Sequence, residues 1–246
     1  MQKNTDTRLE HALAGEYKID IKAAMKEGWE KTGISRGAML QGLAVVIVIS
    51  IMLLLLIEAF TVQNGLDKDA FNVQLITNLL LTALVAPFAA ALVMMGVDTS
   101  IGKATRVADV FQFVSKTVIL TITAILTSAI VQIGLLLFII PGLYMIIATG
   151  FAVPLVLDRK LLPAQAIMTS IKVVNHQWLE FVKLYAMFFL LAVLVIVTFG
   201  IALIWVAPFY YNVKGVLYRE IFGVYAQTPI ADDTTVGQAR DDVFDA

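Results

Sequence analysis

Long uncharged apolar runs dominate the chain, and they predict helices that span a membrane. A helix needs about 20 mostly apolar residues to cross the hydrocarbon core of a bilayer. The first such run covers residues 39–57 and ends before Glu58. The second covers residues 73–97 and ends before Asp98, and Pro87 near its middle predicts a kink in the helix.

Two longer uncharged runs each predict a pair of helices. Residues 117–157 hold no formal charge and are roughly twice as long as one span, so a turn is expected at Pro141 and Gly142. The run 184–213 is divided by Gly200 in the same way. Together the runs predict six membrane-spanning helices, at residues 39–57, 73–97, 115–139, 143–157, 181–199 and 201–221.

The Lys and Arg residues predict the orientation of these helices. Positively charged residues concentrate in the cytoplasmic loops of membrane proteins. When the loops and ends are assigned to alternate sides, 17 of the 18 Lys and Arg residues fall on one side, and Lys68 alone falls on the other. This asymmetry predicts that both termini lie in the cytoplasm.

Segments outside the spans carry an apolar face, and they predict helices that lie along the membrane surface. In residues 17–31, Lys side chains recur every four residues beside an apolar face. Such a helix either enters the membrane interface or packs on the helical bundle. A weaker pattern of the same kind covers residues 103–113. The apolar face of residues 17–31 consists of Ile21, Ala24, Met25, Gly28 and Trp29.

Residues 163–178 predict an amphipathic elbow between the fourth and fifth spans. Pro163 suits the first turn of a helix, where no backbone N–H is required. Polar residues such as Gln165 and Lys172 lie away from the apolar stripe, so the segment is too polar to be a further span. The stripe consists of Ala164, Ile167, Met168, Ile171, Val174 and Trp178.

The amino-acid composition also indicates a membrane protein. Hydrophobic residues make up 59% and charged residues 15% of the 246 residues, and the mean hydropathy is +0.85. Soluble domains have about 45–50% apolar and about 25% charged residues. We therefore expect an all-α, polytopic helical bundle with about six transmembrane helices, cytoplasmic elbow helices and both ends inside. Its parts are a cytoplasmic segment with an amphipathic helix at 1–37, a transmembrane domain at 38–222, and an acidic, disordered cytoplasmic tail at 223–246.

The chain offers little for catalysis, cofactors or metals. It has no Cys and only two His residues, far apart at His11 and His176, so no metal site is expected. The net charge of −1 gives no reason to expect nucleic acid as a partner. No phosphate-binding glycine loop, zinc-protease motif or serine-hydrolase elbow occurs in the sequence. We therefore expect no enzyme and no cofactor.

Polar residues within apolar runs are the candidates for a functional site, because they are costly in a membrane. Near an edge of the membrane they also have a structural explanation, and neutral polar side chains often bond between helices. An ion pair between Asp98 and either Lys116 or Lys214 is one possibility that the sequence leaves open. The candidate positions are Glu58, Asn78, Asp98, Gln132 and Lys214.

One stretch resembles a known family. It begins at Val131, continues through apolar residues to Pro141 and Gly142, and is followed by a short span with Pro154. Over about residues 130–180 this pattern is similar to the YciC-like bacterial inner-membrane proteins and to the membrane domain attached to some glycerophosphodiester phosphodiesterases. The resemblance implies a six-helix protein of the bacterial inner membrane. It implies no activity, because these membrane domains have no established catalytic residues, and the sequence has no room for the phosphodiesterase catalytic domain.

Two functions fit these observations. The first is a non-enzymatic accessory or envelope-maintenance factor of the inner membrane that acts through contacts with lipids, with another membrane protein or with itself. The second is a transporter or lipid-handling protein with a cavity between kinked helices, lined by Asn78 and Gln132. A water-accessible cavity that reaches the middle of the membrane and is lined by Asn78, Gln132 or Glu58 would favour transport. A solid bundle with an exposed apolar groove would favour a partner subunit.

Overall fold

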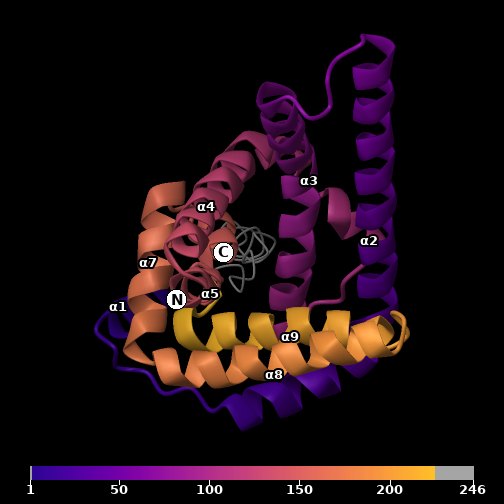
Figure 1. The fold of residues 1–246 in the computed structure, drawn as a ribbon. Coiled ribbons are helices and arrows are strands. Elements are labelled where there is room, and N and C mark those ends of the chain that lie inside the picture. Colours follow the sequence, from indigo (N-terminus) through magenta and orange to yellow (C-terminus); the bar gives the residue numbers. More distant parts are fainter. Residues whose placement is uncertain (1, 225–246) are drawn as a thin grey trace, which may run out of the picture.

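The computed structural model describes residues 2–224, with side chains from Thr7 onward, and the regular structure in this range is entirely helical (Figure 1). From residue 225 on, the predicted acidic tail lies outside the described residues. The elements in chain order are α1 (Gln2–Leu13), α2 (Ile21–Gln63), α3 (Phe71–Ser100), the 3-10 turns η1 (Val107–Phe111) and η2 (Val114–Lys116), α4 (Thr117–Leu137), α5 (Ile139–Ala148), α6 (Ala152–Asp158), α7 (Pro163–His176), α8 (Trp178–Val197) and α9 (Leu203–Phe222).

Five described segments are long and apolar enough to cross a membrane, so the chain is an all-α, multi-pass membrane protein. α9 is not one of them, because its second half carries Lys214, Arg219 and Glu220. The sixth span therefore stays a prediction. The five segments are Ile21–Gln63, Phe71–Ser100, Val107–Leu137, Ile139–Asp158 and Trp178–Val197.

α2 joins the predicted amphipathic segment and the first span in one continuous helix. It begins after Asp20, whose carboxylate accepts a hydrogen bond of 3.0 Å from the backbone N–H of Ala23. In Figure 1 the first part of α2 passes below α8 and α9 before the helix turns upward. Ala24 and Gly28 are buried in the bundle, whereas Trp29 is 57% exposed. The predicted apolar face is thus divided between helix packing and the outer surface.

The turn between α4 and α5 is not where the sequence predicts it. The chain reverses at Phe138, which is extended with φ −163° and ψ 158°, and Pro141 and Gly142 lie in the first turn of α5. Pro is tolerated there because the first turn of a helix needs no backbone N–H. Gly142 lets the two helices approach closely, because a Cβ at this position would lie 2.9 Å from the Cα atom of Leu135.

The predicted fourth span is two short helices. α5 ends at Ala148 and α6 begins at Ala152, and Ser170 of α7 satisfies backbone groups in the break between them. The Ser170 hydroxyl donates a hydrogen bond of 2.6 Å to the carbonyl oxygen of Ala148 and accepts one of 3.2 Å from the N–H of Phe151. A buried backbone group without a partner is costly, so this fully buried serine stabilises the break.

The elbow at α7 is a helix as predicted, but its buried face differs from the predicted stripe. Met168 is 58% exposed and Trp178 is 48% exposed. The predicted helix within residues 103–113 is only the short turn η1, in which Val110 is buried and Phe111 is half exposed. The buried face of α7 consists of Ala166, Ile167, Ser170, Val173 and Val174.

α9 is largely buried, and it packs mainly against α2 and α3; in Figure 1 it runs across the lower end of α3, just above α8. Glycines allow the crossing. A Cβ at Gly28 of α2 would lie 3.2 Å from the Cα atom of Val213, and a Cβ at Gly215 would lie 2.7 Å from the backbone nitrogen of Val97. Small residues at helix crossings are typical of membrane proteins, because they let the helix backbones come close together.

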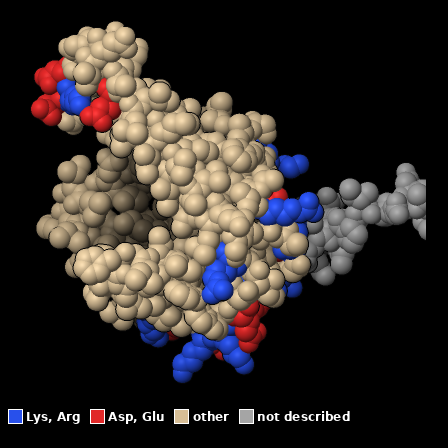
Figure 2. Space-filling model, turned by 90° about the vertical axis from the view of Figure 1, so that its right-hand side faces the viewer, with Lys and Arg blue, Asp and Glu red and all other residues tan. Residues whose placement is uncertain are grey.

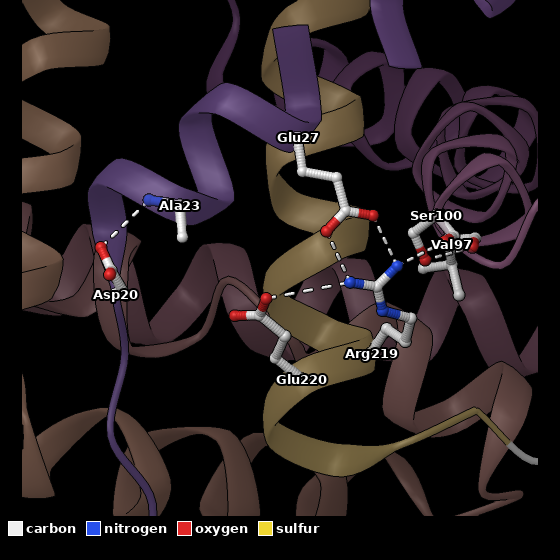
Figure 3. Close-up of polar contacts among 7 residues, drawn as sticks. All are labelled: Asp20, Ala23, Glu27, Val97, Ser100, Arg219 and Glu220. Carbon is white, nitrogen blue, oxygen red and sulfur yellow. Dashed lines mark hydrogen bonds and ion pairs between the residues drawn. The ribbon is translucent and has the colours of Figure 1, made fainter. Parts of the chain in front are cut away.

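Arg219 ties three helices together at one end of the bundle (Figure 3). Its two terminal nitrogens each donate a hydrogen bond of 2.7 Å to the carboxylate of Glu27 in α2, and one of them donates a further bond of 2.5 Å to the carbonyl oxygen of Ser100 at the end of α3. This bidentate geometry is the strongest form of an Arg–carboxylate contact.

The charged side chains leave a broad uncharged surface on the face shown in Figure 2. The loop between α2 and α3 forms an isolated cluster at one extremity, in which Lys68 lies 2.5 Å from Glu58. Most of the other charged groups on this face lie at the opposite end. The α2–α3 loop is thus separated from most of the other charged groups on this face, and the orientation of the helices stays a prediction.

Reporter fusions test the span count and the orientation. Alkaline phosphatase needs an oxidising compartment for its disulfides, so a fusion after Asp69 is expected to be active and fusions after Arg106 or Gly223 inactive. The enzymatic activity of each fusion, normalised to its amount, is the measurement. An active fusion after Gly223 would mean that α9 does not cross the membrane.

Candidate functional site

A groove of about 1190 Å³ lies between α2, α5, α8 and α9. Figure 2 shows a deep hollow within the uncharged surface. The groove exceeds the roughly 300–1,000 Å³ of an ordinary small-molecule pocket. Its lining is apolar and aromatic, and it consists of Leu43, Ile47, Ile140, Leu143, Tyr144, Ile146, Ile147, Trp178, Val182, Tyr185, Ala186, Phe188, Phe189, Leu190, Ala192, Leu203, Val206, Ala207, Tyr210 and Tyr211.

Aromatic and polar groups lie at the end of the groove where α8 begins. Trp178 is the first residue of α8, and the hydroxyl of Tyr144 donates a hydrogen bond of 3.4 Å to the side-chain oxygen of Asn175. Trp and Tyr are enriched where a membrane meets water, so this end of the groove has the character of a membrane interface. α9 begins at Leu203, and in its first turn the ring centre of Trp205 lies 5.8 Å from the guanidinium carbon of Arg36.

Lys214 lies behind the tyrosines of the groove. The residue is only 9% exposed, and its ammonium nitrogen lies 3.4 Å from the hydroxyl of Tyr210 and 5.3 Å from the centre of that ring. Tyr185 is also close, because a Cβ at Gly150 would lie 2.7 Å from the Tyr185 hydroxyl and 3.7 Å from the Lys214 nitrogen. Among the described side chains, no carboxylate lies within 4.0 Å of this ammonium group.

The structure does not bring the sequence-predicted polar residues together. Glu58 and Asn78 line a separate pocket of about 380 Å³ near the α2–α3 loop. Asp98 pairs with Lys103 at 2.9 Å, so neither partner expected from the sequence, Lys116 or Lys214, is the right one.

The remaining candidates lie apart from one another as well. Gln132 is exposed on α4 and lies outside both pockets, so the expected cavity lined by Asn78 and Gln132 does not form. Lys116 lies over the ring of Phe113, with its nitrogen 5.5 Å from the ring centre. Lys214 is the one candidate that borders the groove.

Two buried polar clusters join helices in pairs that the sequence did not predict. Asn212 of α9 donates hydrogen bonds of 3.1 and 2.9 Å to the hydroxyls of Thr32 and Ser35 in α2. Tyr218 donates one of 2.8 Å to the carboxylate of Asp158, whose side chain is 2% exposed. Both clusters join helices far apart in the sequence, and no spacing pattern in a single sequence identifies such pairs.

The segment before α2 is fastened to the end of α7. The hydroxyl of Tyr17 donates a hydrogen bond of 2.5 Å to the carbonyl oxygen of Val173, and burial raises the pKa of this phenol above its usual value. The side chain of Gln177 accepts a bond of 3.1 Å from the N–H of Ile19. His176 contacts the carbonyl oxygen of Leu13 at 3.0 Å. His176 therefore contributes to docking of the N-terminal segment rather than to the groove.

Comparison with known proteins gives no match: no family model, curated protein or solved structure matches this chain. Within the described part of the chain, no group of three or more His, Asp or Glu side chains is placed to hold a metal ion. The groove is the largest apolar opening among the pockets described above, and its lining suits an apolar molecule.

Proposed function

We propose that this protein is a non-enzymatic accessory protein of the bacterial inner membrane that binds a lipid in the groove between α2, α5, α8 and α9. The observation that carries the proposal is the groove itself, which is large, open and apolar. The resemblance of residues 130–180 to bacterial inner-membrane families supports the location, and the distribution of Lys and Arg supports the orientation.

A lipid is the molecule that such a groove meets most often. Acyl chains surround every membrane-spanning helix, and a concave surface between helices must be filled by them or by protein. The lining offers large aromatic and aliphatic side chains, such as Phe188, Phe189 and Leu190, and few polar groups. This lining favours retention of an acyl chain over transport of a polar solute.

Filling the groove tests the proposal. Ala186 is an exposed residue of α8 within the groove, and Ala186→Trp is expected to displace most of the lipid that purifies with the protein. The measurement is the amount of lipid per protein after purification in mild detergent. Ala129→Trp is the matched control, because Ala129 is an exposed alanine of α4 outside the groove. An equal lipid content in both variants and in the unchanged protein would contradict the proposal.

A further inference from the structure

The chemistry around Lys214 identifies the class of lipid. We infer, on the basis of the lipid-binding function proposed above, that the groove selects a phospholipid with a net negative headgroup. In this arrangement the acyl chains occupy the apolar lining of the groove, and the hydroxyl of Tyr210, which Lys214 contacts, holds the headgroup phosphate.

Lys214 brings a buried positive charge close to the groove. Lys214 is buried in the bundle, and no described carboxylate lies within 4.0 Å of its nitrogen. Buried charges in proteins are normally paired, and ionisable residues within membrane helices mark binding sites by default. The neighbours of Lys214 are instead the aromatic residues that line the groove. A ligand in the groove is thus the natural source of the missing negative charge.

The hydroxyl of Tyr210 links this charge to the groove. The Lys214 ammonium donates a hydrogen bond to the hydroxyl of Tyr210, and Tyr210 also lines the groove. A tyrosine hydroxyl that accepts a bond from a cation still has its own hydrogen to donate. Tyr210 therefore connects the buried charge to an acceptor in the groove, and Tyr185 and Tyr211 also line the groove.

The position of Lys214 in the bundle also suits a phospholipid headgroup. Gly215, next to Lys214, packs against the backbone of Gly96 and Val97, and Val97 is followed by Asp98 at the polar end of α3. Lys214 thus lies close to the level in the bundle at which α3 changes from apolar residues to the charged residue Asp98. A phospholipid needs a polar contact near the interface and an apolar path beyond it, and the groove offers both. A helix of a partner protein would contact only the apolar lining, and it would leave the buried charge of Lys214 without a counter-charge.

Lipid selection tests this inference. The full-length protein is incubated with vesicles that contain equal amounts of phosphatidylglycerol and phosphatidylcholine with identical acyl chains, and the bound lipids are identified by mass spectrometry. We expect a preference of about tenfold for phosphatidylglycerol, because both lipids offer a phosphate but the choline cation of phosphatidylcholine is repelled by the Lys214 ammonium group. In Lys214→Met the total amount of bound lipid is expected to remain while the preference falls to about one.

Two further variants make the result specific. Lys172→Met is the matched control, because Lys172 is an exposed lysine of α7 outside the groove, and it is expected to keep the preference. The double variant Tyr185→Phe/Tyr210→Phe retains the charge but removes two hydroxyls. It is expected to lower the preference several-fold, because the headgroup is no longer held close to Lys214. If Lys214→Met does not fold, this double variant decides the question.

The outcomes separate this inference from the proposed function. Bound lipid with an unchanged preference in the Lys214 and tyrosine variants would overturn the choice of headgroup but leave lipid binding intact. No bound lipid in the unchanged protein would overturn both. A lipid-free dimer whose dissociation exposes the groove would show that a second copy of the chain is the occupant, and this too would overturn both.

Discussion

Gly96→Ala is expected to abolish the folded protein. A Cβ at Gly96 would overlap the carbonyl oxygen of Tyr211 and lie 2.7 Å from its carbonyl carbon. Both atoms belong to the backbone of α9, so no side-chain rotation relieves the overlap. Overpacking costs about 1–3 kcal/mol in ordinary cores, and occasionally more. At Gly96 the overlap would force α3 and α9 apart, and the packing between these two helices would be lost.

Control variants at other glycines separate the effect of the helix crossing from the effect of a Gly→Ala change on helix propensity. Gly33 and Gly37 lie in α2, and a Cβ at either position meets no atom within 4 Å. Gly33→Ala and Gly37→Ala are therefore expected to leave the protein unchanged or to stabilise it by about 0.5–1 kcal/mol. The measurements are the yield of monodisperse protein in detergent and its thermal transition. A Gly96→Ala protein that melts like the unchanged one would mean that α3 and α9 do not cross at this point.

The contrast between α8 and α9 shows what a single sequence predicts and what it does not. The break at Gly200 was predicted from the length of the uncharged run, and the structure shows a φ of +88° there, which glycine adopts readily. The burial of α9 was not predictable from its residues, because Lys214 and Arg219 made it the least apolar of the expected spans. Its polar side chains are satisfied by other helices, and hydropathy carries no information about which helices meet.

The position of turns was predicted less well than the position of helices. Pro141 and Gly142 were expected to form a turn because the dipeptide usually does, but the first turn of a helix accepts both residues. The decisive feature is the extended backbone of Phe138, and phenylalanine has no turn preference that would have identified it. Local propensity here indicated the right region and missed the residue by three positions.

The candidate site, too, was predicted only in part from the sequence. Lys214 was identified as an ionisable residue within an apolar run, and the structure places it beside the groove. The groove itself was not predictable, since it forms where α2, α5, α8 and α9 meet and these helices are separated by up to about 160 residues in the chain. The sequence left open whether Asp98 pairs with Lys116 or Lys214, and the structure pairs it instead with Lys103, which follows shortly after α3.

The second large effect is expected at α7. Ile167 is 2% exposed, and Ile167→Asp would bury a carboxylate without a partner. The effective penalty is several kcal/mol per buried ion, which is a large part of the roughly 5–15 kcal/mol that stabilises an ordinary domain. We expect little folded protein, measured as the yield and the thermal transition in detergent. Thr169→Asp on the partly exposed side is expected to be mild.

Met168→Asp distinguishes two reasons for the sensitivity of α7. The sequence pattern places Met168 on the same apolar stripe as Ile167, with both entering the membrane, whereas the structure leaves Met168 58% exposed and buries Ile167 against the bundle. If packing on the bundle is the cause, Met168→Asp is tolerated far better than Ile167→Asp, because its carboxylate stays in contact with water. Equal damage at both positions would show that this face of α7 lies in the acyl chains, and equal tolerance would show that α7 has no buried face.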